Sequence, residues 1–557
     1  MPLSSCRIGV FFALLSLCLK TRMEGYFYAP ICYKFNGSDK ILCRISNVLC
    51  EIADRKLFEI DDLSIHEYDR IGLIGKNGSG KSTLLKLIAG GLNPTKGQIE
   101  KYGTAAYLPQ LKPKQGMMSG GEITQEWIRR IFSLERDFFL LDEPTTHLDQ
   151  YHIEKLEDEL KQFSKPLLIV SHDRAFLDEL CTKIWEIDEE TIIEYTGNYS
   201  DFEAQKQEKL QHHKKEYEKY VQKKKQLENA LRLKEQKANR AIKKPKKTSN
   251  SEAKITGAKP YFAKKQKKLN QGVKDIQSRI DQLDKVEKIK QPTPIKMELA
   301  SPIEASNKPL IRCEQLLGKV GSKNLWKPVS FNIENGEKIA ILGPNGSGKT
   351  TLIQELIHND EHVNRSPQVK IGYFSQQLEQ LDVKKTILKN VQDTSSQDET
   401  LIRTVLARLG FFREDVFKDV SVLSGGERVK VSLAKIFVSD VNLLILDEPT
   451  NFLDIESIKA LELLLSEYPG TVLFVSHDRR FVENIAEKLI ILQDHILHIF
   501  KGTEHEFLES QNQTDQDEER LVIETQITEV LSRLSIDPSP ELEEEYESLL
   551  ERKRELD

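Results

Sequence analysis

The sequence predicts an α/β fold in which two copies of one phosphate-binding domain are joined by a long antiparallel helical hairpin. Three observations support this. Five short motifs occur twice, in the same order, along the 557 residues. The first motif of each set is a glycine-rich loop between an apolar strand and a helix. A highly charged stretch without glycine or proline, residues 202–241, separates the two sets.

The composition limits the class of protein. Hydrophobic residues make up 39% of the chain, enough for several cores, and charged residues make up 30%, which is typical of long solvated helices. The seven cysteines are scattered and form no Cys-x-x-Cys pair, so neither a zinc site nor a disulfide framework is expected.

Residues 1–40 are predicted to be an extension outside the fold. Their apolar run, Ile8–Leu19, is shorter than the roughly twenty residues that cross a bilayer. It could also be the core of a signal peptide. An exported protein would meet no nucleotide, however, so we expect a cytoplasmic protein whose natural start is Met23 or a point near Ile41.

The first motif is a phosphate-binding loop in both copies. Backbone N–H groups of such a loop converge on phosphate oxygens, and the following helix adds positive potential. Lys81 and Lys349 should contact the β- and γ-phosphates, while Ser82 and Thr350 should ligate Mg²⁺. The full predicted phosphate sites are Gly75, Asn77, Gly78, Ser79, Gly80, Lys81, Ser82 and Thr83, and Gly343, Asn345, Gly346, Ser347, Gly348, Lys349, Thr350 and Thr351.

Two apolar strands end in an Asp-Glu pair, Asp142-Glu143 and Asp447-Glu448. We expect each Asp to hold Mg²⁺, and each Glu to polarise or position the attacking water. A histidine after the next strand is more often structural, but its recurrence at the same offset favours γ-phosphate sensing by His172 and His477. Gln110 and Gln376 can reach the metal or the water.

The repeat carries one insertion. The offset between copies is 266 residues at the glutamine motif and 305 at every later motif. The second copy therefore has about 39 residues that the first copy lacks, including a helical pattern around 401–409. We expect a reduced helical subdomain in the first domain.

The linker is strongly basic. Residues 201–290 hold 27 Lys and Arg against 12 Asp and Glu, as expected for salt-dependent contact with phosphates. Helices are predicted over 202–241 and from about Phe262 to Ile289, with a tip near 246–259 where Pro, Gly, Ser and Asn occur. A solvated charged coiled coil is the alternative. The candidate RNA-contacting residues are Lys243, Lys244, Lys246, Lys247, Lys254, Lys259, Tyr261 and Phe262.

The acidic tail, residues 511–557, holds 15 Asp and Glu against 5 Lys and Arg, which disfavours contact with RNA. Its apolar spacing predicts a helical pair, either docking on a protein or simply solvated. The expected organisation is an extension (1–40), a first domain (41–200), a linker (201–308), a second domain (309–508) and the acidic helical extension (509–557).

The motif order resembles that of ATP-binding cassettes over about 41–200 and 309–505, and the resemblance implies ATP and Mg²⁺ as ligands. No aromatic residue stands out as an adenine platform, so adenine over guanine rests on this resemblance. In the family two domains pair head to tail, which implies a monomer in which Lys81 meets Ser424 and Lys349 meets Ser119. The signature residues are Ser119, Gly120, Gly121, Glu122, Ser424, Gly425, Gly426 and Glu427.

Two such domains and a basic helical linker resemble the ABC-F family of ribosome-associated factors. The segments Ile184–Glu189, Gly257–Ala263 and Thr528–Ser535 are similar to those of its Vga-type antibiotic-resistance members. The resemblance implies a linker that enters the tRNA exit site of the bacterial ribosome, near large-subunit rRNA and P-site tRNA. It also implies protection from lincosamides, pleuromutilins and streptogramin A, with ATP hydrolysis driving release.

Three alternatives remain open. A housekeeping ABC-F translation factor would share every motif. The ATPase subunit of a transporter would dock on a separate membrane protein, which makes a long basic linker superfluous. A DNA-repair or chromosome-structure ATPase usually carries its coiled coil within one domain and not between two.

Overall fold

A computed structural model of the chain describes residues 40–556, with gaps at 53–54, 111–119, 147, 243–257, 284, 287–308, 322, 376–380, 396 and 537–539. Apart from Lys40, the N-terminal extension lies outside the described residues. No helix in the described part of the chain is both long and apolar enough to cross a membrane.

The first domain is built on a mixed sheet whose described strands follow the order β4-β1-β2-β9-β8-β3-β7-β6-β5. Strand β3 pairs in parallel with β7 and β8, and β6 pairs in parallel with β5 and β7. Strands covered on both faces read as continuous apolar runs, which explains why β6 and β7 are buried at every residue.

The elements of the first domain are the strands β1 (Ile41–Ile52), β2 (Arg55–His66), β3 (Arg70–Gly75), β4 (Lys96–Lys101), β5 (Ala105–Leu108), β6 (Phe138–Asp142), β7 (Leu167–Val170), β8 (Lys183–Asp188) and β9 (Thr191–Thr196), and the helices α2 (Lys81–Ala89), α3 (Gly120–Phe132), α4 (Gln150–Gln162) and α5 (Arg174–Leu180).

The second domain repeats this plan. Its described core strands follow the order β14-β15-β16-β12-β17-β18, and a smaller sheet has the order β11-β10-β13. Its elements are β10 (Ile311–Val320), β11 (Lys323–Ile333), β12 (Lys338–Leu342), α8 (Lys349–His358), β13 (Val363–Arg365), β14 (Ile371–Phe374), α9 (Ile387–Gln392), α10 (Glu399–Arg408), η2 (Arg413–Phe417), η3 (Val420–Val422), α11 (Gly425–Phe437), β15 (Leu443–Asp447), α12 (Ile455–Glu467), β16 (Thr471–Val475), α13 (Arg479–Ile485), β17 (Lys488–Gln493) and β18 (Ile496–Lys501).

The two domains differ where the repeat offset changes. In the second domain α9, α10, η2 and η3 lie between β14 and α11, and they pack into the same hydrophobic core as the sheet. In the first domain only residues 109–119 separate β5 from α3. The two predicted copies of one α/β domain are therefore present, and the helical insertion belongs to the second copy.

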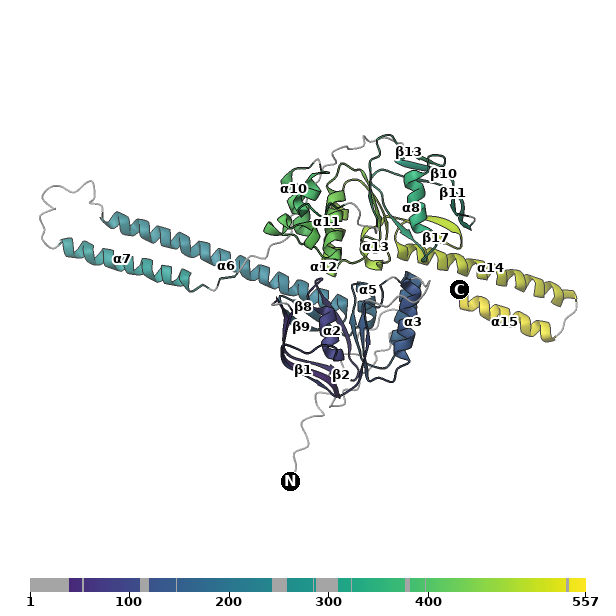
Figure 1. The fold of residues 1–557 in the computed structure, drawn as a ribbon, viewed down its shortest axis with the longest axis horizontal. Coiled ribbons are helices and arrows are strands. Elements are labelled where there is room, and N and C mark those ends of the chain that lie inside the picture. The colour runs from purple at the N-terminus through teal and green to yellow at the C-terminus, as the bar shows by residue number, and fades with distance from the viewer. Residues whose placement is uncertain are drawn as a thin grey trace, which may run out of the picture. The chain divides into compact units, whose positions relative to one another are not determined.

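The linker contains two helices that pack against each other, α6 (Tyr199–Ile242) and α7 (Ala258–Asp281) (Figure 1). The predicted bounds of α7 were wrong at both ends. It begins at Ala258 because Pro260, in its first turn, needs no hydrogen-bond donor there. It ends at Asp281, where the Leu283 N–H bonds to the Ile280 carbonyl (3.2 Å) in a tighter turn that closes the helix.

The acidic extension forms a second pair of packed helices, α14 (Glu504–Ile536) and α15 (Pro540–Leu556) (Figure 1). Ile523 and Val530 of α14 are buried, 2% and 3% exposed. Lys553 of α15 forms an ion pair with Glu524 (2.7 Å). Since α14 begins directly after β18, it follows the second domain just as α6 follows β9 of the first.

Candidate active site

Each phosphate-binding loop connects a central strand to a helix, β3 to α2 and β12 to α8. Gly80 and Gly348, which precede the helices, have φ values of 102° and 109°. A Cβ at Gly80 would lie 2.8 Å from the Phe58 ring, and one at Gly348 would lie 2.8 Å from Leu325. Both the backbone conformation and the space therefore require glycine.

The loop lysines are buried and wrapped by their own loops. The Lys81 Nζ donates to the carbonyls of Gly75 (2.7 Å) and Lys76 (3.1 Å). The Lys349 Nζ donates to those of Gly343 (2.8 Å) and Pro344 (3.1 Å). Burial lowers the pKa of both lysines, so an anion placed in the loop would stabilise their charged form.

Hydroxyl groups are available for a phosphate in both loops. The buried Ser79 Oγ and Ser347 Oγ have no hydrogen-bond partner among the described residues. Buried hydroxyls are normally paired, so these two fit a ligand with acceptor oxygens. At the first phosphate-binding loop there is a cavity of about 230 Å³. It is lined by Asn77, Gly78, Gly80, Lys81, Ser82, Thr83, Gln110, Asp142, Glu143 and His172.

The predicted magnesium ligands also lie together. Ser82 is hydrogen-bonded to Asp142, and the Thr350 Oγ1 donates to the Asp447 Oδ2 (3.0 Å). The Asp142 Oδ1 is buried and has no hydrogen-bond partner among the described residues. A hydroxyl and a carboxylate beside a phosphate loop match the oxygen donors that Mg²⁺ prefers, so the residues fit this ion.

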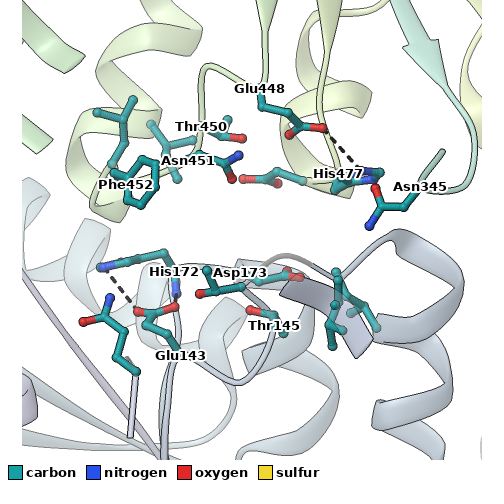
Figure 2. Close-up of a pocket in the computed structure, with 18 of the residues that line it drawn as sticks. Glu143, Thr145, His172, Asp173, Asn345, Glu448, Thr450, Asn451, Phe452 and His477 are labelled. Carbon is teal, nitrogen blue, oxygen red and sulfur yellow. Dashed lines mark hydrogen bonds and ion pairs between the residues drawn. The ribbon is translucent and has the colours of Figure 1, made fainter. Parts of the chain in front are cut away.

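The two glutamates have a strained backbone. Glu143 and Glu448 have φ values of 51° and 52°, in the left-handed region where residues other than glycine are rare and strain tends to mark functional sites. Their side chains face the two histidines. The distance from Nε2 to Oε1 is 3.3 Å both for His172 and Glu143 and for His477 and Glu448 (Figure 2).

Burial determines the protonation of these groups. It raises the pKa of Glu143 to about 8 and that of Glu448 to about 7, against the opposing charges of Lys81 and Lys349. It lowers the pKa of His172 to about 3 and that of His477 to about 4. Both imidazoles are therefore neutral at pH 7, so their approach to the glutamates is not an ion pair. The hydrogen bond to Glu143 comes from the His172 backbone N–H, which donates to Oε2 (3.4 Å).

Hydrogen bonds between the domains join the phosphate-binding loop of each domain to an aspartate of the other domain. The Asn77 N–H donates to the Asp454 Oδ2 (2.9 Å), and the Asn345 N–H donates to the Asp149 Oδ2 (2.8 Å). Asp149 and Asp454 also cap the helices α4 and α12. These two aspartates were not predicted, although both follow a Leu at the offset of 305 residues that the other late motifs share.

The signature residues of each domain lie opposite the phosphate-binding loop of the other domain. A Cβ at Gly426 would lie 3.1 Å from the Asn77 side-chain nitrogen. Gly121 lines a cavity of about 460 Å³ together with Asn345 and Gly346. Glu143 and His172 from one domain, and Glu448 and His477 from the other, line the same cavity (Figure 2). This is the head-to-tail arrangement expected from the resemblance.

Ser424 caps the N-terminus of α11 and forms a reciprocal capping box with Glu427. The Glu427 N–H donates to the Ser424 Oγ (3.3 Å), and the Ser424 N–H donates to the Glu427 Oε2 (2.8 Å). The signature thus presents a helix N-terminus, which favours anions. In the first domain Gly120 and Glu122 lie in the first turn of α3. Gly425 and Thr351 occupy the first turns of α11 and α8.

The remaining predicted site residues belong to the linker or lie outside the described residues. Lys259, Tyr261 and Phe262 belong to the first turns of α7. The following lie outside the described residues: Ser119, Gln376, Lys243, Lys244, Lys246, Lys247 and Lys254.

A further residue that the sequence did not single out is Tyr107. Its hydroxyl donates to the Asp142 Oδ2 (3.2 Å). Tyr107 lies in β5, which pairs with β6, so it holds the carboxylate from the neighbouring strand. The available signal for this role was a tyrosine three residues before the glutamine in both copies, Tyr107 before Gln110 and Tyr373 before Gln376.

The sequence profile of the family described as ABC transporter matches residues 58–110 and 326–451. Curated relatives extend the similarity to the linker. The chain is 33% identical to the ribosome protection protein VmlR of Bacillus subtilis over 93% of this chain and 99% of that protein. It is 35% identical to the erythromycin resistance ATP-binding protein MsrA of Staphylococcus epidermidis over 80% and 97%.

A third relative is ABC transporter F family member 5 of Arabidopsis thaliana, 34% identical over 70% of this chain and 54% of that protein. Among solved structures, the archaeal ribosome recycling factor aABCE1, in complex with the ribosomal stalk protein aP1, has a TM-score of 0.56 at 18% identity. The match covers 83% of this chain and 92% of that one. At this identity the structural likeness concerns the fold alone.

Proposed function

Since the chain belongs to the ABC-F family of ATP-binding-cassette proteins, we propose that it is an ATPase that binds the bacterial ribosome and protects it from antibiotics. The names of two relatives, a ribosome protection protein and an erythromycin resistance protein, support this proposal. A ribosomal partner also implies a cytoplasmic location.

In the proposed reaction two ATP molecules bind between the domains. Site one comprises Lys81, Glu143 and His172, with the signature of the second domain opposite. Site two comprises Lys349, Glu448 and His477, with the signature of the first domain opposite. Ser82, Thr350 and the two aspartates, Asp142 and Asp447, would hold Mg²⁺, which neutralises phosphate charge when bound.

Each glutamate would position the attacking water and take up its proton. Its neutral histidine partner lies 3.3 Å away and has one N–H, which can donate a hydrogen bond toward the transferred phosphoryl group. The strained backbone at both glutamates and the buried surroundings keep this geometry rigid. Because both sites carry the glutamate and the histidine, both are equipped for hydrolysis.

The observation that carries the proposal is the anchoring of the linker helix on the opposite domain. Although α6 follows the first domain in sequence, its root contacts α12 and α13 of the second. Tyr199 is 1% exposed and lies under the cationic groups of Lys459 and Arg480, 5.6 and 5.3 Å from its ring centre. Glu203 forms ion pairs with the same two cations.

These contacts connect nucleotide binding to the linker. Closing the domains on ATP forms the contacts of both the phosphate loops and the root of α6, so α6 is anchored on both domains only in the closed state. The closed protein would hold the linker in the tRNA exit site, with its tip, residues 246–259, near the peptidyl-transferase region. There it would dislodge lincosamides, pleuromutilins or streptogramin A, and hydrolysis would release the protein.

The test is co-sedimentation of the double variant Glu143→Gln, Glu448→Gln with purified bacterial ribosomes. We expect retention on ribosomes with ATP, little without it, and release of the unsubstituted protein as ATP is consumed. Association that is unchanged by ATP would contradict the proposed coupling. Failure to associate at low salt would remove the ribosome as the partner.

A housekeeping translation factor of the same family is the second candidate, because the same contacts would serve it. Drug susceptibility of cells with and without the gene separates the two. Protection from any of the three drug classes requires the resistance function, whereas slower growth without the gene and unchanged susceptibility would favour the housekeeping role. Altered drug accumulation would instead indicate the ATPase subunit of a transporter.

A further inference from the structure

Two arginines cross the domain interface next to the catalytic histidines. In each domain the histidine is followed by an aspartate and an arginine, His172-Asp173-Arg174 and His477-Asp478-Arg479. Arg174 is the first residue of α5, and Arg479 is the first residue of α13. Neither arginine contacts the predicted phosphate loops, so the reaction described above leaves both unexplained.

Arg174 of the first domain binds two carboxylates of the second. Its guanidinium donates to Glu462 of α12 through Nη2 (2.5 Å) and Nη1 (3.3 Å), and to the Asp478 Oδ2 (3.5 Å). The three side chains are 3%, 12% and 8% exposed. This ion cluster is therefore buried at the interface, and it includes the residue that directly follows His477.

Arg479 makes the equivalent contact with a glutamate of the first domain. It forms an ion pair with Glu157 of α4, whose side chain is 5% exposed. Its charge also acts on the buried Asp173, opposing the rise in pKa that burial causes there. Glu157 and Glu462 are separated by 305 residues, as are Arg174 and Arg479. The two clusters thus occupy equivalent positions in the two copies.

The aspartates hold the histidine loops in a fixed shape. Asp478 accepts a hydrogen bond at Oδ1 from the Phe481 N–H (3.0 Å), and its own N–H donates to the Ser476 Oγ (3.1 Å). Asp173 makes the equivalent bonds with Phe176 (3.0 Å) and Ser171 (3.1 Å). Arg174, which holds the Oδ2 edge of Asp478, therefore also restrains the neighbouring His477. Arg479 acts on the His172 loop through its charge on Asp173 and its ion pair with Glu157.

We propose that Arg174 and Arg479 are positioning residues that couple the two ATP sites, each acting on the histidine loop of the opposite domain. Arg174 positions His477 in site two, and Arg479 positions His172 in site one. The inference deepens the proposed function, because it rests on hydrolysis at both sites. Breaking a buried ion pair by removing one partner leaves an uncompensated charge, so the remaining carboxylates would draw water in and the loop would shift.

The experiment measures single-turnover hydrolysis of ATP, with protein in excess, in two parent variants that each keep one site. Glu143→Gln leaves site two, and Glu448→Gln leaves site one. In these parents Arg174→Ala should slow site two about tenfold and site one at most about twofold, since a displaced catalytic group can cost up to about a hundredfold. Arg479→Ala should show the reverse, with the larger loss of rate at site one.

Matched controls separate positioning from loss of stability. Arg408→Ala removes another buried arginine, 7% exposed, that pairs with Glu467 (2.8 Å) inside the second domain. It should lower the melting temperature without slowing hydrolysis more at one site than at the other. Arg174→Lys keeps the charge and should recover most of the rate at site two. If Arg174→Ala does not fold, the test rests on Arg174→Lys. This variant should also slow site two more than site one, but by a smaller factor.

The outcomes are distinguishable. The coupling is supported if each alanine variant slows mainly the site whose histidine belongs to the opposite domain. Equal losses at both sites, or a larger loss at the site of the arginine's own domain, would overturn it while leaving the proposed function intact. Parents that both fail to hydrolyse ATP would overturn hydrolysis itself, and the inference with it.

Discussion

At the scale of single residues, the two glutamates are equivalent in position, and their pKa values are shifted in the same direction. Burial raises the pKa of Glu143 to about 8 and that of Glu448 to about 7. The base must be deprotonated to accept a proton from water, so activity at each site should rise with pH through the pKa of its glutamate.

These raised values predict the pH profiles of the two single-site variants, Glu143→Gln and Glu448→Gln. The value of kcat/KM reports ionisations of the free protein and of free ATP. In both variants kcat/KM should still rise above pH 7, because the remaining glutamate is partly protonated there. The measurement is kcat/KM from pH 5.5 to 9.5. A profile that is flat above pH 7 in either variant would contradict the raised pKa of its glutamate.

The histidines should not contribute to these profiles. Burial lowers the pKa of both imidazoles to about 4 or below. They remain neutral over the whole range, so they add no step to the loss of activity on acidification. The sequence motifs had identified one glutamate and one histidine in each domain. The protonation state of these side chains depends on burial and therefore on the fold.

At the scale of elements, the root of α6 is the part of the linker whose contacts carry functional meaning. Glu203 lies one turn after Tyr199, and both face α12 and α13 of the other domain through Lys459 and Arg480. The helix continues for 44 residues in total, so a small change at its root becomes a large displacement at its far end.

Glu203→Lys is expected to uncouple ATP from the linker. The new cation would face Lys459 and Arg480, and like charges placed together across an interface are strongly unfavourable. In the Glu143→Gln, Glu448→Gln background, ATP-dependent retention on ribosomes should weaken roughly tenfold. Glu208→Lys, with the same charge change at an exposed position of α6, is the control and should retain binding. Equal behaviour of the two variants would argue against the anchoring role.

At the scale of the whole molecule, charge is divided between parts with different roles. Residues 201–290 hold 27 basic and 12 acidic residues, while residues 511–557 hold 5 and 15. A basic linker should bind rRNA phosphates with release of counterions, and its affinity should fall as salt rises. The acidic helices α14 and α15 should add nothing to this dependence.

A four-lysine variant tests that division. Replacing Lys243, Lys244, Lys246 and Lys247 with Gln should flatten the plot of log affinity for ribosomes against log salt concentration, by roughly one unit of slope for each lysine that contacts a phosphate. The same change at four exposed lysines of the domains should leave the slope unaltered. These control positions are Lys96, Lys319, Lys323 and Lys327. An unaltered slope in the linker variant would contradict phosphate binding by this segment.

Much of the fold could be predicted because its signals are local. An apolar run that ends in Asp-Glu, a glycine-rich loop before a helix and a charged stretch without glycine each constrain a few neighbouring residues. Their repetition in the same order extended these signals to two domains, and a single large change of offset located the helical insertion in the second domain.

The contacts between the domains could be found only in the tertiary structure. Asp149 with Asn345, Asp454 with Asn77, and Arg174 with Glu462 and Asp478 join residues roughly two to four hundred positions apart. No local pattern encodes such pairs, because they depend on the relative orientation of two folded domains. The motifs of this chain therefore specify two phosphate sites, whereas the packing of one domain on the other determines which residues complete each site.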